Sequence, residues 1–140
     1  MSSELRQLIR ERKLVRIVPN RKMILKEIEG ALTDLQDAKD SFKHKKFKWA
    51  TIQGYYSMFH SARALLYHKG FREKSHYAIS VALRELFANE LGGVISKFEE
   101  GMELRQEADY GLKFSEDGAI ETIEGAERFL EKAKQILRIK

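Results

Sequence analysis

A row of polar side chains interrupts the apolar pattern of residues 51–70. In a helix through this segment, at about 100° per residue, four polar side chains fall in one line beside an apolar stripe. They are Tyr56, His60, Arg63 and Tyr67. Polar groups at the edge of a buried stripe need hydrogen-bond partners or must face a cavity. A cation, an imidazole and two phenols suit an anionic group such as a phosphodiester, so we expect the chemistry here.

A second segment, from about Val94, replaces apolar residues with charged ones in the same way. Its apolar line continues at helical spacing through Arg105 and Asp109, and Tyr110 follows directly. If the two helices meet, Asp109 would pair with Arg63 or with Arg105. This arrangement has two interpretations: a buried salt-bridge network that fixes helix register, or a cleft lined by Arg, His and Tyr that accepts an anionic ligand or RNA.

Two further histidines lie near the end of the first segment. Arg63 and His68 have four residues between them, but on a regular helix their side chains diverge by about 140°, whereas His60 lies beside Arg63. His76, at the start of the next helix, lies beyond the same helix end and could join the cluster. The histidine that works with Arg63 is therefore left open between His60 and His68.

We predict neither a metal site nor a cofactor. The segment Glu73 to His76 matches one Glu-x-x-His unit of di-iron bundles, but such sites need two units and two further Glu residues. The chain has no cysteine to supply thiolate ligands and no glycine-rich phosphate loop.

The composition indicates one all-α domain. The chain has 140 residues, 43% hydrophobic and 34% charged, with one proline and an apolar period of three to four residues. The N-terminal segment lacks a signal-peptide core, and no apolar run reaches membrane-spanning length. We therefore expect a soluble cytoplasmic protein with no membrane partner.

The net charge of +5 comes from the N-terminal end. Residues 1–22 hold seven Lys and Arg against two Glu, and a second basic cluster surrounds His44. Such patches fit phosphate contacts, although cations also stabilise helix C-termini or form a solvated face. We expect residues 1–20 to form a basic arm or short helix, and residues 21–140 to form the bundle.

Helix signals divide the rest of the chain. Asn20 and Ser75 are expected N-caps, Gly70 is an expected C′ residue, and Gly92 with Gly93 breaks a helix. In the loop 111–118, Asp117 is the expected N-cap of the last helix. The FREKS segment at 71–75 is expected to be a plain connection between two helices. The pattern predicts an antiparallel up-and-down bundle of about five to six helices with a four-helix core.

With these residues in view, the chain resembles the HEPN domain (higher eukaryote and prokaryote nucleotide-binding domain) in its small stand-alone prokaryotic form. The resemblance rests on two motifs and extends over residues 21–138. One is YYSMFHSARALLYHKG at 55–70 with KSH at 74–76, and the other is LRQEADYG at 104–111.

The resemblance implies a bundle that forms homodimers. Many HEPN proteins are metal-independent ribonucleases that use an Arg and a His separated by four to six residues, with the motifs of two protomers facing each other. Arg63 and His68 have that spacing in this sequence. The resemblance assigns the His to proton transfer at the ribose 2′-hydroxyl or leaving oxygen, and the Arg to phosphate charge.

The resemblance leaves two hypotheses of different class. The first is a ribonuclease toxin, using Arg63 with His68 or His60 and paired with a minimal nucleotidyltransferase in a toxin–antitoxin module. The second is a noncatalytic module that binds a nucleotide or other phosphate-bearing ligand, or a tail of the nucleotidyltransferase. Its expected ligand-binding residues are Tyr56, Tyr67, His76, Arg105, Asp109 and Tyr110.

Overall fold

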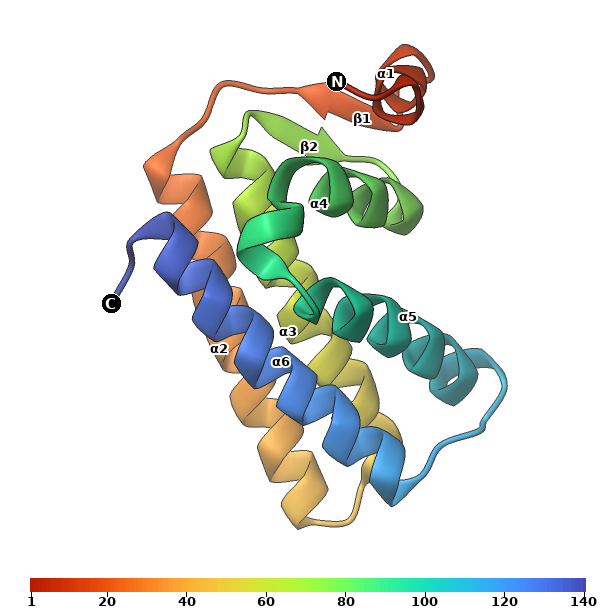
Figure 1. Ribbon diagram of the computed structural model, residues 1–140. Helices are drawn as coiled ribbons and strands as arrows, with labels where there is room; N and C mark the ends of the chain where they lie inside the picture. The colour runs from red at the N-terminus through yellow and green to blue at the C-terminus, as the bar shows by residue number, and fades with distance from the viewer.

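The computed structural model describes all residues 1–140 and confirms an all-α bundle. In chain order its elements are α1 (Ser3–Arg10), β1 (Leu14–Arg16), α2 (Arg21–Lys43), α3 (Phe47–His68), β2 (Phe71–Glu73), α4 (His76–Leu91), α5 (Val94–Tyr110) and α6 (Glu116–Leu137). The long helices α2, α3 and α6 lie side by side, α5 packs on α3 and α6, and α4 lies across the upper part of the bundle (Figure 1). None of the helices combines the length and apolar composition that a membrane span requires.

The centre of the core lies where α3, α5 and α6 approach most closely. The rings of Tyr55, Phe98 and Phe129 follow one another across it, with centroids 5.7 and 6.1 Å apart. The close approach of α3 and α6 favours glycine at position 54, because a Cβ there would lie 2.9 Å from the Thr122 side chain and 3.5 Å from the Thr122 backbone. Apolar packing of this kind contributes most of the stability of a helical bundle.

Local sequence signals set most helix ends. The Asn20 side chain accepts from the backbone N–H of Lys22 at 2.8 Å, and the Ser75 hydroxyl accepts from that of Ala78 at 3.1 Å. Gly70 follows α3 with φ of +83°, in the left-handed region expected for a C′ glycine. These caps were predicted from the sequence and are confirmed.

The predicted cap of the last helix is wrong. Ser115 caps α6, because its hydroxyl accepts from the Gly118 backbone N–H at 2.9 Å. Asp117 lies instead in the first turn of α6, where its negative charge interacts favourably with the positive end of the helix dipole. Both residue types are common N-caps, but Ser115 is the one whose hydroxyl reaches the backbone N–H of the third helical residue, Gly118.

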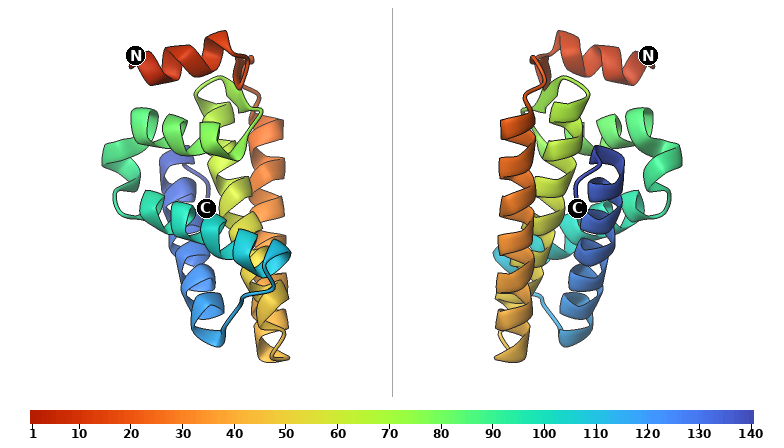
Figure 2. Two further views of the ribbon diagram at one scale, coloured as in Figure 1. Left: turned by 90° about the vertical axis from the view of Figure 1, so that its right-hand side faces the viewer. Right: turned by 90° about the vertical axis from the view of Figure 1, so that its left-hand side faces the viewer.

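Residues 1–20 pack on the bundle through α1 and β1. Leu5 and Leu8 of α1 are buried, and α1 lies against α4 (Figure 2). Strand β1 pairs antiparallel with β2, so that Val15 lies opposite Arg72 and Leu14 opposite Glu73. The FREKS segment was expected to be a plain connection, and this expectation is wrong because β1, more than fifty residues earlier, supplies its hydrogen bonds. This pairing fixes β2 beside the end of α3.

Candidate functional site

A cavity of about 300 Å³ lies where the last turns of α3, strand β2 and the start of α4 meet. Its lining contains three cationic side chains, one carboxylate, one imidazole, one hydroxyl and one aromatic ring. These residues are Phe59, Arg63, Arg72, Glu73, Lys74, Ser75 and His76. We call this cavity the α3–α4 pocket. Because cations outnumber carboxylates in the lining, the pocket favours an anion.

Arg63 is fixed in the pocket by two hydrogen bonds to one carboxylate. Its Nε donates to Glu73 Oε1 at 3.0 Å, and its Nη2 donates to Glu73 Oε2 at 2.8 Å. A second carboxylate, on Glu27, lies 3.6 Å from Nη1, and the guanidinium stacks on Phe59 at 4.5 Å from the ring centroid. Burial alone would lower the pKa of Arg63, but the bond to Glu73 and the charge of Glu73 outweigh it and raise that pKa. The cation is therefore permanent and rigidly held.

His76 opens α4 and, like Arg63, contacts the Phe59 ring. Its ring stacks on Phe59 with centroids 4.9 Å apart, and its Nδ1 is hydrogen-bonded to the Tyr55 hydroxyl. Burial is the largest influence on His76 and lowers its pKa; the charge of Arg105 lowers the pKa further, while Glu73 opposes both. The imidazole is therefore largely neutral at pH 7. Nε2 has no partner within the chain, which leaves it available to a ligand.

Arg105 lies behind these rings as a buried cation with few partners. Arg105 is only 6% exposed, and its guanidinium carbon lies 5.1 Å from the ring centroid of Tyr55 and 5.8 Å from that of Tyr56. The nearest carboxylate, on Asp109, is 3.9 Å away, and Arg105 Nε has no hydrogen-bond partner. Of the two pairs expected for Asp109, the structure contains the one with Arg105. A buried cation left in this condition attracts an anionic group.

His60 occupies an acidic environment although it lies beside Arg63 on α3. Its Nδ1 lies 2.6 Å from Glu27 Oε2, and its Nε2 lies 3.3 Å from Asp34 Oδ2. Burial raises the pKa of the Asp34 carboxyl, and the neighbouring imidazole opposes this effect. Since both ring nitrogens face carboxylates, His60 has no free nitrogen to offer an anionic ligand.

His68 does not meet Arg63. Helix α3 stays regular to its last residue, so the two side chains point to different sides of it. His68 is exposed and lines a separate hollow with Arg21 and Arg138. The spacing that suggested an Arg63–His68 pair therefore does not bring them together within one chain.

The predicted tyrosines take three different positions. Tyr67 is buried, and burial raises the pKa of its phenol, although Arg63 opposes this effect. Tyr56 is half-buried beneath Arg105, while Tyr110 is 77% exposed with its ring 5.9 Å from the Arg105 guanidinium carbon. None of the three lines the α3–α4 pocket. Tyr56 and Tyr110 belong to the surroundings of Arg105.

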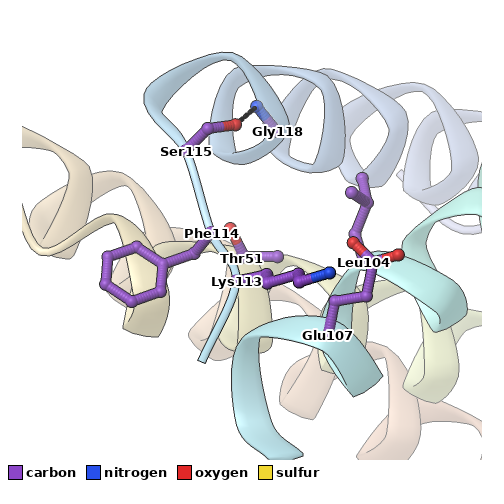
Figure 3. Close-up of a pocket in the computed structure, with 7 residues that line it drawn as sticks. All are labelled: Thr51, Leu104, Glu107, Lys113, Phe114, Ser115 and Gly118. Carbon is purple, nitrogen blue, oxygen red and sulfur yellow. Dashed lines mark hydrogen bonds between the residues drawn. The ribbon is translucent and has the colours of Figure 1, made fainter. Parts of the chain in front are cut away.

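Another pocket, of about 230 Å³, lies between the start of α3, the end of α5 and the start of α6. Its lining residues are Thr51, Leu104, Glu107, Lys113, Phe114, Ser115 and Gly118 (Figure 3). It holds no imidazole, and its one cation is matched by one carboxylate. Of the residues predicted from the sequence, Arg63 and His76 line the α3–α4 pocket, and none lines this second pocket.

Sequence reasoning missed several residues that shape the site. Arg72 and Lys74 lie in the segment taken for a plain connection, and Glu73 was considered only as a metal ligand. Glu27 and Asp34 did carry a signal, since they are seven residues apart at the edge of the apolar stripe of α2. Tyr55 and Phe59 belong to the buried apolar stripe of α3, and spacing alone does not distinguish them from ordinary core residues.

The match to a known family agrees with this fold. The HEPN domain family model matches residues 25–140, which is most of the chain, and the chain belongs to this family. Helices α3, α4 and α5, which carry the site, all lie within the matched residues, whereas α1 and β1 lie outside them.

Two archaeal proteins are similar over most of their length. A "UPF0332 protein" of Archaeoglobus fulgidus is 36% identical over 105 residues, which cover 71% of this chain and 83% of that protein. A protein of Methanocaldococcus jannaschii named "Putative toxin MJ0605" is 35% identical over 118 residues, covering 79% of this chain and 86% of that protein.

Proposed function

We propose that this protein is the toxin of a toxin–antitoxin pair and cleaves RNA without a metal ion in the α3–α4 pocket. Membership of the HEPN family and the toxin name of the Methanocaldococcus relative support the biological class. The observation that carries the site is the cavity that combines Arg63, Arg72 and Lys74 with the imidazole of His76. Cations that bind a phosphodiester and an imidazole that moves protons are the two requirements of metal-independent RNA cleavage.

In the proposed reaction, the ribose 2′-hydroxyl attacks the adjacent phosphorus. The new O–P bond closes a 2′,3′-cyclic phosphate, the bond to the 5′-oxygen breaks, and the proton lost by the 2′-hydroxyl is balanced by one gained at the leaving oxygen. His76 takes or gives that proton through Nε2, since Tyr55 engages Nδ1. Arg63 and Arg72 stabilise the charge that develops on the phosphate oxygens.

This proposal replaces the histidine that spacing along α3 suggested. His60 faces two carboxylates and His68 lies outside the pocket, whereas His76 shares the cavity with Arg63. The Arg and the His of the proposed site therefore come from different helices. A second copy of the chain and a minimal nucleotidyltransferase antitoxin are the partners we propose, on the basis of the family resemblance.

One observation favours a second function. The Arg63 guanidinium already makes two hydrogen bonds to Glu73, so part of its capacity to bind phosphate is used inside the chain. A site arranged in this way suits noncatalytic binding of a nucleotide or of a partner's acidic tail, in which Arg72 and Lys74 supply the main attraction.

An RNA cleavage assay in EDTA separates the two functions. The wild type, Arg63→Ala and Arg63→Lys are incubated with single-stranded RNA, while circular dichroism verifies that each is folded. Arg128→Ala serves as the matched control, because Arg128 is an exposed arginine of α6 outside the pocket. We expect cleavage by the wild type and Arg128→Ala, and loss of cleavage in both Arg63 variants, since Lys lacks the planar fork of Arg.

Binding of the RNA without cleavage by any folded protein would support the noncatalytic function. Equal cleavage by Arg63→Ala and wild type would contradict the proposed site.

A further inference from the structure

One basic hollow is not explained by the proposed function. It has a volume of about 540 Å³ and is lined by Arg21, His68, Ile136, Leu137 and Arg138. It lies where α2 begins and α3 and α6 end, at the end of the bundle that also carries the β1–β2 pair (Figure 1). No carboxylate side chain lines it, in contrast to the α3–α4 pocket.

The two arginines of the hollow have no carboxylate partner. Neither Arg21 nor Arg138 lies within 4.0 Å of a carboxylate, whereas Arg63, Arg84 and Arg105 each do. The C-terminal ends of α3 and α6 each contribute about half a negative charge. Together these two helix ends offset about one unit of charge, which is less than the two positive charges of the arginines. The N-terminus of α2 adds further positive potential, so an excess of positive charge remains.

The chain fixes the side chain of Arg21 and the backbone of Arg138. Arg21 Nη1 donates to the Leu137 carbonyl at 2.9 Å, which fixes the guanidinium at the edge of the hollow and leaves its other N–H groups available. Arg138 ends α6 in the left-handed conformation, with φ of 57°, and its backbone N–H bonds back to the Gln135 carbonyl at 3.2 Å. Ile136 and Leu137 supply an apolar wall beside these donors.

We propose that this hollow is a second phosphate-binding site, in which Arg21 and Arg138 bind the phosphate oxygens and His68 donates a further hydrogen bond. The chemistry fits a phosphodiester of RNA outside the cleaved bond, or a free phosphate group of a nucleotide. The site gives a role to His68, which lies outside the α3–α4 pocket. Phosphate binding in this hollow does not require RNA cleavage, so it can be tested independently of the proposed ribonuclease activity.

The test follows the His68 imidazole by NMR during two titrations, one with inorganic phosphate and one with a single-stranded RNA hexanucleotide methylated at its 2′-hydroxyls. Sodium chloride at matched ionic strength controls for screening. Arg138→Gln removes one cation of the site, and Arg128→Gln is the matched control, since Arg128 is an exposed arginine of α6 outside the hollow.

We expect saturable shifts of His68 with phosphate, unchanged in Arg128→Gln and weakened at least about tenfold in Arg138→Gln, as for one lost charge-assisted hydrogen bond. If RNA is the source, it also shifts His68, and Arg138→Gln lowers the salt dependence of log K by about 0.7. A shift with phosphate alone would assign the site to a free phosphate group. Absence of a saturable shift, or equal shifts in both variants, would overturn the proposal.

Discussion

Two histidines near Arg63 lie in opposite electrostatic environments. His60 is on the same helix as Arg63 and one turn away, yet Glu27 and Asp34 face its two ring nitrogens. His76 is thirteen residues from Arg63 in the sequence, yet it lines the same cavity, and the charges of Arg105 and Arg63 help to lower its pKa. An anion is repelled from the first imidazole and attracted to the second.

The difference shows that the partners on neighbouring elements decide what an imidazole can do. Helix α2 contributes carboxylates on one side of α3. On the other side, β2 contributes Arg72, the connection from β2 to α4 contributes Lys74, and α5 contributes Arg105. Arg63 lies at the boundary, with Glu27 3.6 Å away on one side and Phe59, which also contacts His76, on the other. The predictions below test this asymmetry.

The largest expected effect is on catalysis. His76→Asn should lower the rate of RNA cleavage at least about 100-fold, because general acid–base catalysis contributes that much or more. His60→Asn should lower it less than about threefold, since it leaves the pocket intact. Initial rates on a fluorescent single-stranded RNA measure both variants. A larger loss in His60→Asn than in His76→Asn would reverse the assignment of the two histidines.

The two arginines should differ in their contribution to stability. Arg63→Met should lower the free energy of unfolding by about 2 kcal/mol, because it leaves the buried carboxylate of Glu73 without its partner. Arg105→Met should cost less than about 1 kcal/mol, since Arg105 has no carboxylate closer than 3.9 Å and an unpartnered Nε.

Urea denaturation of these two variants and the wild type gives both differences in unfolding free energy. An equal or greater loss in Arg105→Met would mean that its contacts with the tyrosine rings hold the fold together more than the Arg63–Glu73 ion pair does.

A smaller effect should appear in the pH dependence of stability. His76 has a pKa below its usual 6.5 in the folded state, so the unfolded chain binds its proton more readily as the pH falls below that value. The contribution of His76 to stability is therefore complete above pH 6.5 and is lost as the pH falls through the lowered pKa. The slope for one proton is at most about 1.4 kcal/mol per pH unit.

His76→Asn should reduce this slope between about pH 7 and pH 5, measured by denaturation at several pH values. The same slope in His76→Asn and wild type would show that another group titrates.

The smallest effect concerns the cap that holds His76 in place. Ser75→Ala should cost about 1 kcal/mol of stability and also lower cleavage, because Ser75 caps α4 directly before His76. Ser115→Ala removes the corresponding cap of α6 and should cost a similar amount without affecting the rate. Equal rates in the two variants, measured with thermal unfolding of each, would show that the α4 cap does not position the histidine.

The sequence predicted what depends on neighbouring residues. Helical periodicity gave the bundle, and the caps Asn20 and Ser75 with the C′ residue Gly70 gave helix ends, because these signals act within a few residues. The β1–β2 pair escaped prediction, since each strand is three residues long and its partner lies far away in the chain.

The site was harder to predict for the same reason. Spacing along one helix placed His60 beside Arg63, which is geometrically right, but it could not reveal that Glu27 and Asp34 face that histidine from α2. The Glu73 partner of Arg63 comes from β2, whose position depends on the unpredicted strand pairing. The charge around each group is set by such contacts between elements.

The most direct test of the central claim is one NMR titration with the non-cleavable hexanucleotide, in which the four histidines serve as reporters of their own surroundings. We predict saturable shifts of the His76 imidazole, no saturable shift of His60, and loss of the His76 shifts in Arg63→Ala. Saturable shifts of His60 with none at His76 would contradict the account, because RNA would then bind on the acidic side of α3.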